Sequence, residues 1–150
     1  VERMMDRKIE AFIEEHHVMT LATDGADTLH CCNLFYVYVP DARVFVVTSS
    51  AETFHVHQLE KSDRIAASIV LETSVVGQIR GLQIRGTMRR PEGERLRSAR
   101  KAYLKRFPFA VFMDVDVWVI EPDYFKYTDN RLGFGKKIVW EKERNGHEAE

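Results

Sequence analysis

The chain has 150 residues, of which 45% are hydrophobic and 30% are charged, and its 22 basic and 23 acidic side chains give a formal net charge of -1. This length suits a single domain, residues 1–150, that buries a sizeable core without disulfide or metal crosslinks. The balanced charge disfavours a non-specific nucleic-acid binder. No apolar run approaches the ~20 residues that span a bilayer, and the charged N-terminal region lacks a signal-peptide pattern, so we expect no membrane partner and a cytoplasmic location.

Hydrophobic periodicity predicts a mainly β chain with flanking helices. Asp24-Gly25 and Pro40-Asp41-Ala42 are turn sequences between strands. Glycines within residues 78–90 favour a bulge or bend of the kind that curves a sheet into a barrel. In chain order the predicted elements are a helix at 3–16 within the N-terminal segment 1–17, strands at 18–23, 29–39 and 43–47, a helix at 51–61, strands at 64–71 and 78–90, a helix at 92–106, strands at 115–127 and 132–140, and a charged tail at 141–150.

The predicted strand at 115–127 is apolar on both faces around Val117–Ile120. Such a strand needs cover on two sides. A partner subunit is one source of the outer cover, which predicts a homodimer.

The predicted strand at 29–39 carries one polar side chain, Asn33, among the apolar odd-numbered residues. A carboxamide donates and accepts hydrogen bonds at once, which suits the uracil-like edge of a flavin ring. The alternative is a buried asparagine that pairs with backbone at a bulge. The adjacent Cys31 and Cys32 point to opposite faces, where a mutual disulfide would be strained, and we interpret them as small buried hydrophobic side chains.

The junction between the strand at 43–47 and the next helix is dense in hydrogen-bond donors. A helix N-terminus offers free N–H groups and the positive end of a dipole, which together favour a phosphate group. The alternative is that the hydroxyls only cap the helix, with Ser49 as N-cap and Glu52 completing a capping box. Both interpretations remain open from the spacing. The donors are Thr48, Ser49, Ser50, Thr53 and His55.

The histidines do not form a metal-binding pattern. His55 and His57 are two residues apart on a predicted helix, so they face away from each other and cannot share an ion. His30 and Cys32 share a strand face, but two ligands do not make a site. We therefore expect no metal.

Three blocks of the sequence resemble a known family. They are Ile79–Gly86, then Glu92–Glu94 with Ala99–Tyr103 and Arg106–Pro108, and finally Thr128–Trp140. On these blocks the chain resembles the YhbP-like family of small bacterial proteins, within the pyridoxamine-phosphate-oxidase-like, FMN-binding split-barrel superfamily. The resemblance covers most of the chain.

The resemblance implies a six-stranded antiparallel split β-barrel, a homodimer, and FMN lying between the subunits, without implying a substrate. The superfamily holds the phosphate with a Ser-Arg-Lys-type segment, which matches Thr53-Phe54-His55 here. Phe54 stands where that pattern has arginine, and His55 where it has lysine.

These observations lead to a first hypothesis, an FMN-dependent oxidoreductase of unknown substrate in which the flavin performs the electron or hydride transfer. The alternative is a non-catalytic dimer that binds flavin or haem, which Phe54 favours. The expected cofactor-binding residues are Asn33 at the ring, Thr48, Ser49, Ser50, Thr53 and His55 at the phosphate, Arg80 and Gln83 as further polar contacts, and Lys136 and Trp140 from the partner subunit.

Overall fold

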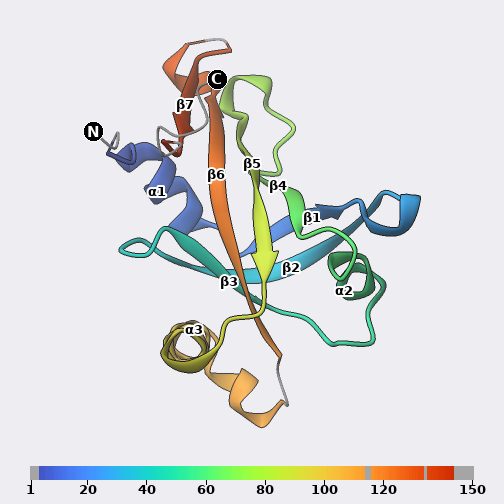
Figure 1. The fold of residues 1–150 in the computed structure, drawn as a ribbon. Coiled ribbons are helices and arrows are strands. Elements are labelled where there is room, and N and C mark those ends of the chain that lie inside the picture. The colour runs from blue at the N-terminus through green and yellow to red at the C-terminus, as the bar shows by residue number, and fades with distance from the viewer. Residues whose placement is uncertain (1–3, 114–115, 134, 144–150) are drawn as a thin grey trace.

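The computed structural model describes residues 4–113, 116–133 and 135–143, which form one antiparallel sheet with helices around it (Figure 1). Its α-helices are α1 (Arg7–Glu15), α2 (Phe54–Leu59) and α3 (Gly93–Arg106). Its strands are β1 (Val18–Thr23), β2 (His30–Val39), β3 (Val44–Thr48), β4 (Arg64–Val70), β5 (Arg80–Arg89), β6 (Val117–Asp129) and β7 (Lys137–Glu141). Every predicted strand and helix is present in the predicted order, and the predicted tail beyond residue 143 lies outside the described residues.

The sheet closes on itself. Its strand order is β3-β2-β1-β4-β5-β6-β7, and β3 pairs with β6 as well, so six strands form a closed antiparallel barrel and β7 extends the sheet beyond it. This arrangement confirms the predicted split barrel. The predicted bulge is also present, because the register of β5 against β6 shifts between Arg85 and Gly86. A Cβ atom at Gly86 would lie 2.2 Å from the carbonyl oxygen of Glu121, so only glycine fits there.

Two helices close the ends of the barrel. At one end α1 buries Ile9, Phe12 and Ile13, each worth about 2 kcal/mol when removed from water. At the other end α2 buries Val56 and Leu59 against the same core. Strand β1 begins shortly after α1 and ends at α2. None of the helices in the described residues is long and apolar enough to cross a membrane.

Helix α3 covers part of the outside of the barrel. Val117 and Val119 of β6 pack against Tyr103 and Phe107 of α3, whereas Trp118 on the same strand faces the core. The strand is therefore covered on both sides, as its sequence predicts. The expectation that a partner subunit provides the outer cover at this strand is wrong, because the cover comes from the chain's own helix. Val115, the predicted first residue of the strand, lies outside the described residues.

The largely apolar, odd-numbered face of β2 is the outer face of the barrel. Its even-numbered residues face the barrel interior, where Tyr36 and Tyr38 are buried, and Asn33 lies on the exposed outer face. The odd-numbered Val37 and Val39 look equally apolar because they pack under α3. A strand with apolar residues on both faces does not reveal which face is inside.

Candidate functional site

A row of polar side chains crosses the outer face of the barrel at right angles to the strands. Thr20 of β1 lies opposite both Asn33 of β2 and Ser68 of β4, and Ser68 lies opposite Gln83 of β5. All four side chains are exposed, and Lys126 of β6 continues the row beyond Gln83. Asn33 and Gln83 are three strand spacings apart along the sheet, roughly 14 Å. The structure thus places Asn33, expected at the ring, and Gln83, expected as a further polar contact, on one surface.

A second row lies next to the first and supplies a flat floor. Ala22 and Ala66 face each other on β1 and β4, and no side chain larger than a methyl group rises from the sheet at these positions. The side chains at both ends of this row are larger than a methyl group. Its members, in order across the sheet, are Cys31, Ala22, Ala66, Arg85 and Tyr124.

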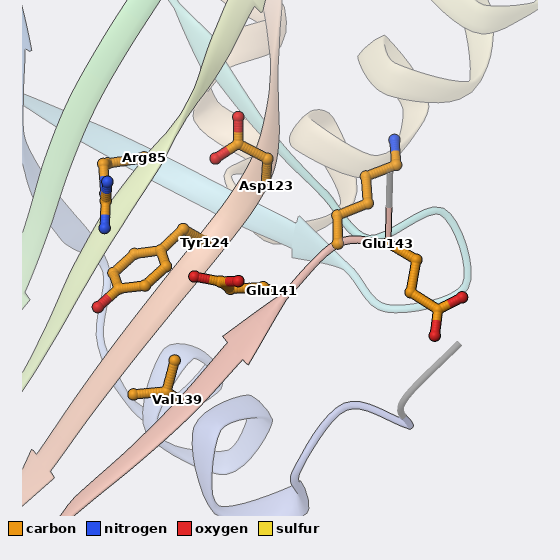
Figure 2. A pocket seen from close by; sticks show the side chains of 7 residues that line it. Arg85, Asp123, Tyr124, Val139, Glu141 and Glu143 are labelled. Atoms are coloured by element: carbon orange, nitrogen blue, oxygen red, sulfur yellow. The ribbon is translucent and has the colours of Figure 1, made fainter. Parts of the chain in front are cut away.

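Two hollows lie over this part of the outer face. One, of about 560 Å³, has Ala22, Ala66 and Gly86 among its lining residues and is flanked by Arg64 and Arg85. The other, of about 900 Å³, continues from Arg85 toward β7 (Figure 2). There the Arg85 guanidinium lies 3.8 Å from the centre of the Tyr124 ring, a cation–π contact that stiffens the long arginine side chain.

Asn33 is held in one orientation on this surface. The Thr20 hydroxyl donates a hydrogen bond of 2.9 Å to the Asn33 side-chain oxygen. The Asn33 NH₂ group has no partner among the described residues, so it is available as a donor toward a ligand. Asn33 therefore does not pair with backbone at a bulge, which was the alternative interpretation.

The predicted phosphate residues form a separate, buried cluster at the end of the barrel that α2 closes. His55 is only 6% exposed, and its Nε2 lies 2.8 Å from the Ser49 hydroxyl and 3.4 Å from the Thr53 hydroxyl. Its Nδ1 lies 3.6 Å from Cys32 Sγ. Burial, and secondarily the charge of His30, lowers the pKa of His55 below its usual value. The imidazole is therefore neutral at physiological pH.

The thiol of Cys32 is likewise kept uncharged. Burial raises the pKa of Cys32, and the neighbouring Cys31 adds to the effect. Both cysteines are free thiols, as expected, but the prediction that both are buried is wrong, because Cys31 lies exposed on the outer face of β2 and Cys32 is only partly buried. Among the described residues no three histidine, cysteine or acidic side chains lie close enough together to hold a metal ion.

The predicted capping box is wrong. Helix α2 begins at Phe54 with Thr53 in the N-cap position, and the Ser49 hydroxyl pairs with His55 rather than with a helix N–H group. Ser49 and Glu52 match the Ser-x-x-Glu pattern of a capping box. The Ser49 hydroxyl nevertheless hydrogen-bonds to His55, so it does not cap the helix. Thr48 lies further out, where its hydroxyl donates to the Tyr103 hydroxyl at 3.3 Å.

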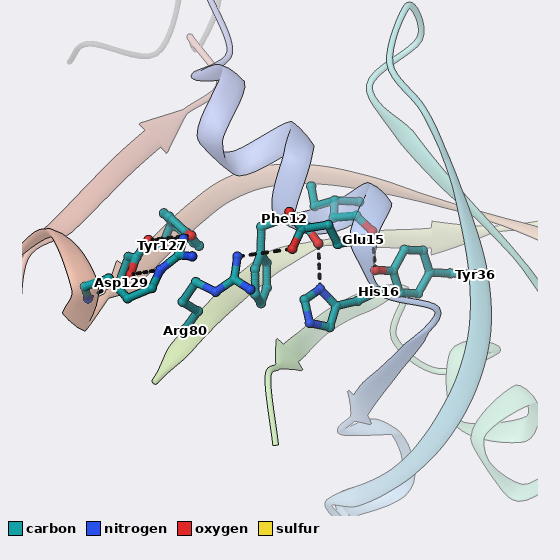
Figure 3. A network of polar contacts seen from close by, with 9 residues as sticks. Phe12, Glu15, His16, Tyr36, Arg80, Tyr127 and Asp129 are labelled. Carbon is teal, nitrogen blue, oxygen red and sulfur yellow. Dashed lines mark hydrogen bonds and ion pairs between the residues drawn. The ribbon is translucent and has the colours of Figure 1, made fainter. Parts of the chain in front are cut away.

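Arg80 lies at the other end of the barrel, away from both groups. Its Nη1 donates to Glu15 of α1 at 3.1 Å, and its guanidinium lies 5.5 Å from the centre of the Phe12 ring (Figure 3). Nearby, the Tyr127 hydroxyl donates to Asp129 at 3.2 Å. Arg80 was expected as a further polar contact, but the structure does not bring it near Asn33, since Arg80 joins the start of β5 to α1.

Lys136 and Trp140, the two residues expected from the partner subunit, differ in their exposure to solvent. Lys136 is exposed on the turn before β7. Trp140 is only 4% exposed and packs 5.4 Å from the Phe125 ring in the core, with the Arg43 guanidinium 6.0 Å from its centre. Trp140 therefore offers a ligand very little free surface in the single chain.

Sequence reasoning missed Thr20, Ser68, Ala22 and Ala66, which connect Asn33 to Gln83. The sequence does contain a pattern that marks these four residues, because small residues alternate with apolar ones in both β1 and β4. Their adjacency depends on β1 pairing with β4, two strands that are far apart in the chain. Neither strand shows this pairing by itself.

Comparison with known proteins gives the family. A UPF0306 protein of Klebsiella pneumoniae subsp. pneumoniae is 37% identical over 141 residues, covering 94% of this chain and 96% of that protein. The chain belongs to the UPF0306 family. The UPF0306 protein YhbP of Escherichia coli O157:H7 is 37% identical over 132 residues, covering 88% of this chain and 90% of its own. No protein-family model matches the sequence.

Solved structures confirm the fold of this UPF0306 chain. A haem-binding protein from Mycobacterium smegmatis superposes with a TM-score of 0.75 at 23% identity, over 94% of this chain and 60% of that one. HutZ, the haem storage protein of Vibrio cholerae, gives 0.68 at 14% identity, over 93% and 96% of the two chains. A putative pyridoxamine 5'-phosphate oxidase from Listeria innocua gives 0.62 at 18% identity, over 81% and 93%. At such identities the likeness shows the split-barrel fold alone.

Proposed function

We propose that this UPF0306 chain binds a flat, flavin-type ring on the outer face of its barrel. The observation that carries the proposal is the row from Asn33 through Thr20 and Ser68 to Gln83, with the floor of Ala22 and Ala66 beside it. A flat ring needs a level surface, and the edge of a flavin needs donors and acceptors, which carboxamides provide together.

The ring half of FMN fits these residues, but its phosphate half does not fit the segment expected to hold it. No lysine or arginine occurs between Val44 and Glu60. His55, the nearest candidate cation, is buried and neutral. The proposal therefore concerns the ring, and no function is assigned to Thr48, Ser49, Ser50, Thr53 or His55 in ligand binding.

The finer proposal is that the bound flavin makes this protein an oxidoreductase. A bound flavin supplies the electron or hydride transfer, so the protein needs only to orient the ring and shield it from water. Asn33 and Gln83 would fix the orientation of the ring. We assign no residue of the chain as acid or base.

We also propose a homodimer in which a second copy covers the ring. The outer face carries exposed apolar side chains at Val18, Phe35 and Val70, which are 43%, 54% and 62% exposed in the single chain. Covering them removes apolar surface from water and would seal a ligand against the floor. Lys136 remains our proposed contribution from the partner.

The free thiols suit the reducing cytoplasm, where we place the protein.

Haem is the second candidate ligand of the same face. Arg64 and Arg85 flank the floor, and neither forms an ion pair with another described residue. Two such cations suit the two propionates of a haem. The relatives of known structure that are described as haem proteins share this fold, which makes haemin a necessary arm of the experiment.

The test is titration of the purified protein with riboflavin, FMN and haemin, followed by flavin fluorescence and by the visible spectrum. Replacing the exposed Gln83 with leucine should weaken flavin binding about fivefold to tenfold, the value of one hydrogen bond. The matched control is Gln78→Leu, which changes an exposed glutamine on the loop before β5. Tight haemin binding without flavin binding would replace the first candidate with the second, and binding of neither would refute both.

A further inference from the structure

The segment from Thr48 to His55 uses its polar groups to hold itself together. Ser49 is 7% exposed, and its hydroxyl pairs with His55 Nε2 at 2.8 Å. The Thr53 hydroxyl donates to the carbonyl oxygen of Ser50 at 2.8 Å. The Thr48 hydroxyl donates to Tyr103 on α3. The Ser50 hydroxyl accepts from the Glu52 N–H group at 3.4 Å, so all four hydroxyls that precede α2 already have protein partners.

Both ring nitrogens of His55 also have protein partners. Its Nδ1 faces the Cys32 thiol at 3.6 Å, and its Nε2 faces Ser49. For His55 to meet a phosphate, the ring would have to leave its buried position and break the contact with Ser49. A neutral, buried imidazole gains too little from an anion to offset those losses.

The charges around the segment do not favour an anion either. The charged side chains from Val44 to Glu60 are Glu52 and Glu60, and both are exposed acids. The residue at the centre of the matching family pattern is Phe54, which stacks edge-on against His30 with ring centroids 5.0 Å apart. With six residues, α2 is too short to supply a strong dipole on its own.

We propose that the ring ligand is recognised without any terminal phosphate, so that the ligand class is flavins and related flat rings irrespective of a phosphorylated tail. This inference rests on the proposed function and assigns a different role to the segment. The cluster of Ser49, Thr53, His55 and Cys32 anchors α2 over the end of the barrel. It closes the core there instead of opening a phosphate site.

The experiment compares two ligands that share one ring and differ by one phosphate. The dissociation constants of the unmodified full chain for riboflavin and FMN are measured by fluorescence quenching at pH 7.5 and moderate salt. We expect values that agree within about threefold, and no competition by millimolar inorganic phosphate. A phosphate held by charge-assisted hydrogen bonds would favour FMN by about tenfold or more.

The possible outcomes separate this inference from the proposed function. Equal binding of both flavins supports both. An FMN preference of tenfold or more, or displacement of FMN by inorganic phosphate, overturns the inference and leaves the flavin site in place. Absence of binding by either flavin overturns the flavin function and the inference with it.

Discussion

At the scale of single residues, burial decides which titratable side chains of this protein are neutral. His55 and Cys32 lie beside each other inside the barrel end, and burial shifts the pKa of each toward its neutral form. The cations of the outer face, Arg64 and Arg85, remain in contact with solvent. The segment before α2 therefore presents no cation to a ligand.

A first prediction concerns the stability of the buried histidine against pH. The folded pKa of His55 lies below its unfolded value of about 6.5, so the unfolded state binds more protons between the two values. The stability that neutral His55 contributes is fully present above pH 6.5 and is lost as the pH falls below it. Urea unfolding at pH 7.5 and pH 5 should show a smaller pH dependence in His55→Gln than in the parent.

The histidine two residues further along is the control for this comparison. His57 is exposed on the same helix, so His57→Gln should keep the pH dependence of the parent. If His55→Gln and the parent lose equal stability, the buried imidazole is not the group that titrates.

A second prediction concerns Phe54, which is 48% exposed and accepts a charged replacement without burying it. Phe54→Arg should change FMN binding by no more than about threefold, because the segment around Phe54 holds no phosphate. An FMN affinity raised about tenfold or more would contradict this, since a guanidinium that reached the phosphate would pair with two of its oxygens at once. Riboflavin, which has no phosphate, should bind as before. The control is Phe54→Leu, which removes the ring without adding charge. Equal changes for FMN and riboflavin would mean that the arginine acts on the ring or on the fold.

At the scale of elements, short helix α2 is fixed by tertiary contacts more than by its own sequence. Gln58 is fully buried; its NH₂ donates to the carbonyl oxygens of Gly25 at 2.8 Å and Thr28 at 2.5 Å, and its oxygen accepts from Thr23 at 2.5 Å. A Cβ atom on Gly25 would lie 2.1 Å from the Gln58 carbonyl oxygen, so the loop needs glycine to approach this closely.

A third prediction follows from these three hydrogen bonds. Gln58→Leu keeps the volume of the side chain but removes hydrogen bonds to the Gly25 and Thr28 carbonyl oxygens and from the Thr23 hydroxyl, in a buried place. The free energy of unfolding should fall by about 3 kcal/mol, measured by urea denaturation. His57→Leu, one residue away and exposed, should change it by less than about 0.5 kcal/mol. A loss below about 1 kcal/mol for Gln58→Leu would show that water replaces the lost bonds.

The same elements show what the sequence can predict and where it stops. Strands, helices and their order follow from periodicity, and the bulge at Gly86 follows from a glycine within a strand. The inner face of β2 and the start of α2 do not follow, because each is decided by a partner distant in the chain: α3 covers Val37, and His55 takes the Ser49 hydroxyl. The site is half predictable for the same reason, since Asn33 stands out locally but Thr20 and Ser68 join it to Gln83 only through strand pairing.

At the scale of the whole molecule, three helices leave one part of the barrel surface uncovered. Helices α1 and α2 close the two ends, and α3 covers the outside near β3 and the start of β6 (Figure 1). The remaining outer face, from Phe35 across β1 and β4 to Tyr124 of β6, carries the polar row, the flat floor and the two hollows. Its apolar border is the part of the described surface that a second copy of the chain would cover.

The final prediction tests this cover. Light scattering at micromolar concentration should give a mass of twice 17.5 kDa for the parent. Val70→Lys places a charge at an exposed position of the outer face, so it should give a monomer whose urea unfolding differs from that of the parent only through the loss of association. Flavin affinity should fall with the dimer, because the ring loses its cover. Val76→Lys, on the loop after β4 and 55% exposed, is the control and should remain a dimer. A monomeric parent would refute the dimer, and a dimeric Val70→Lys would move the interface away from this face.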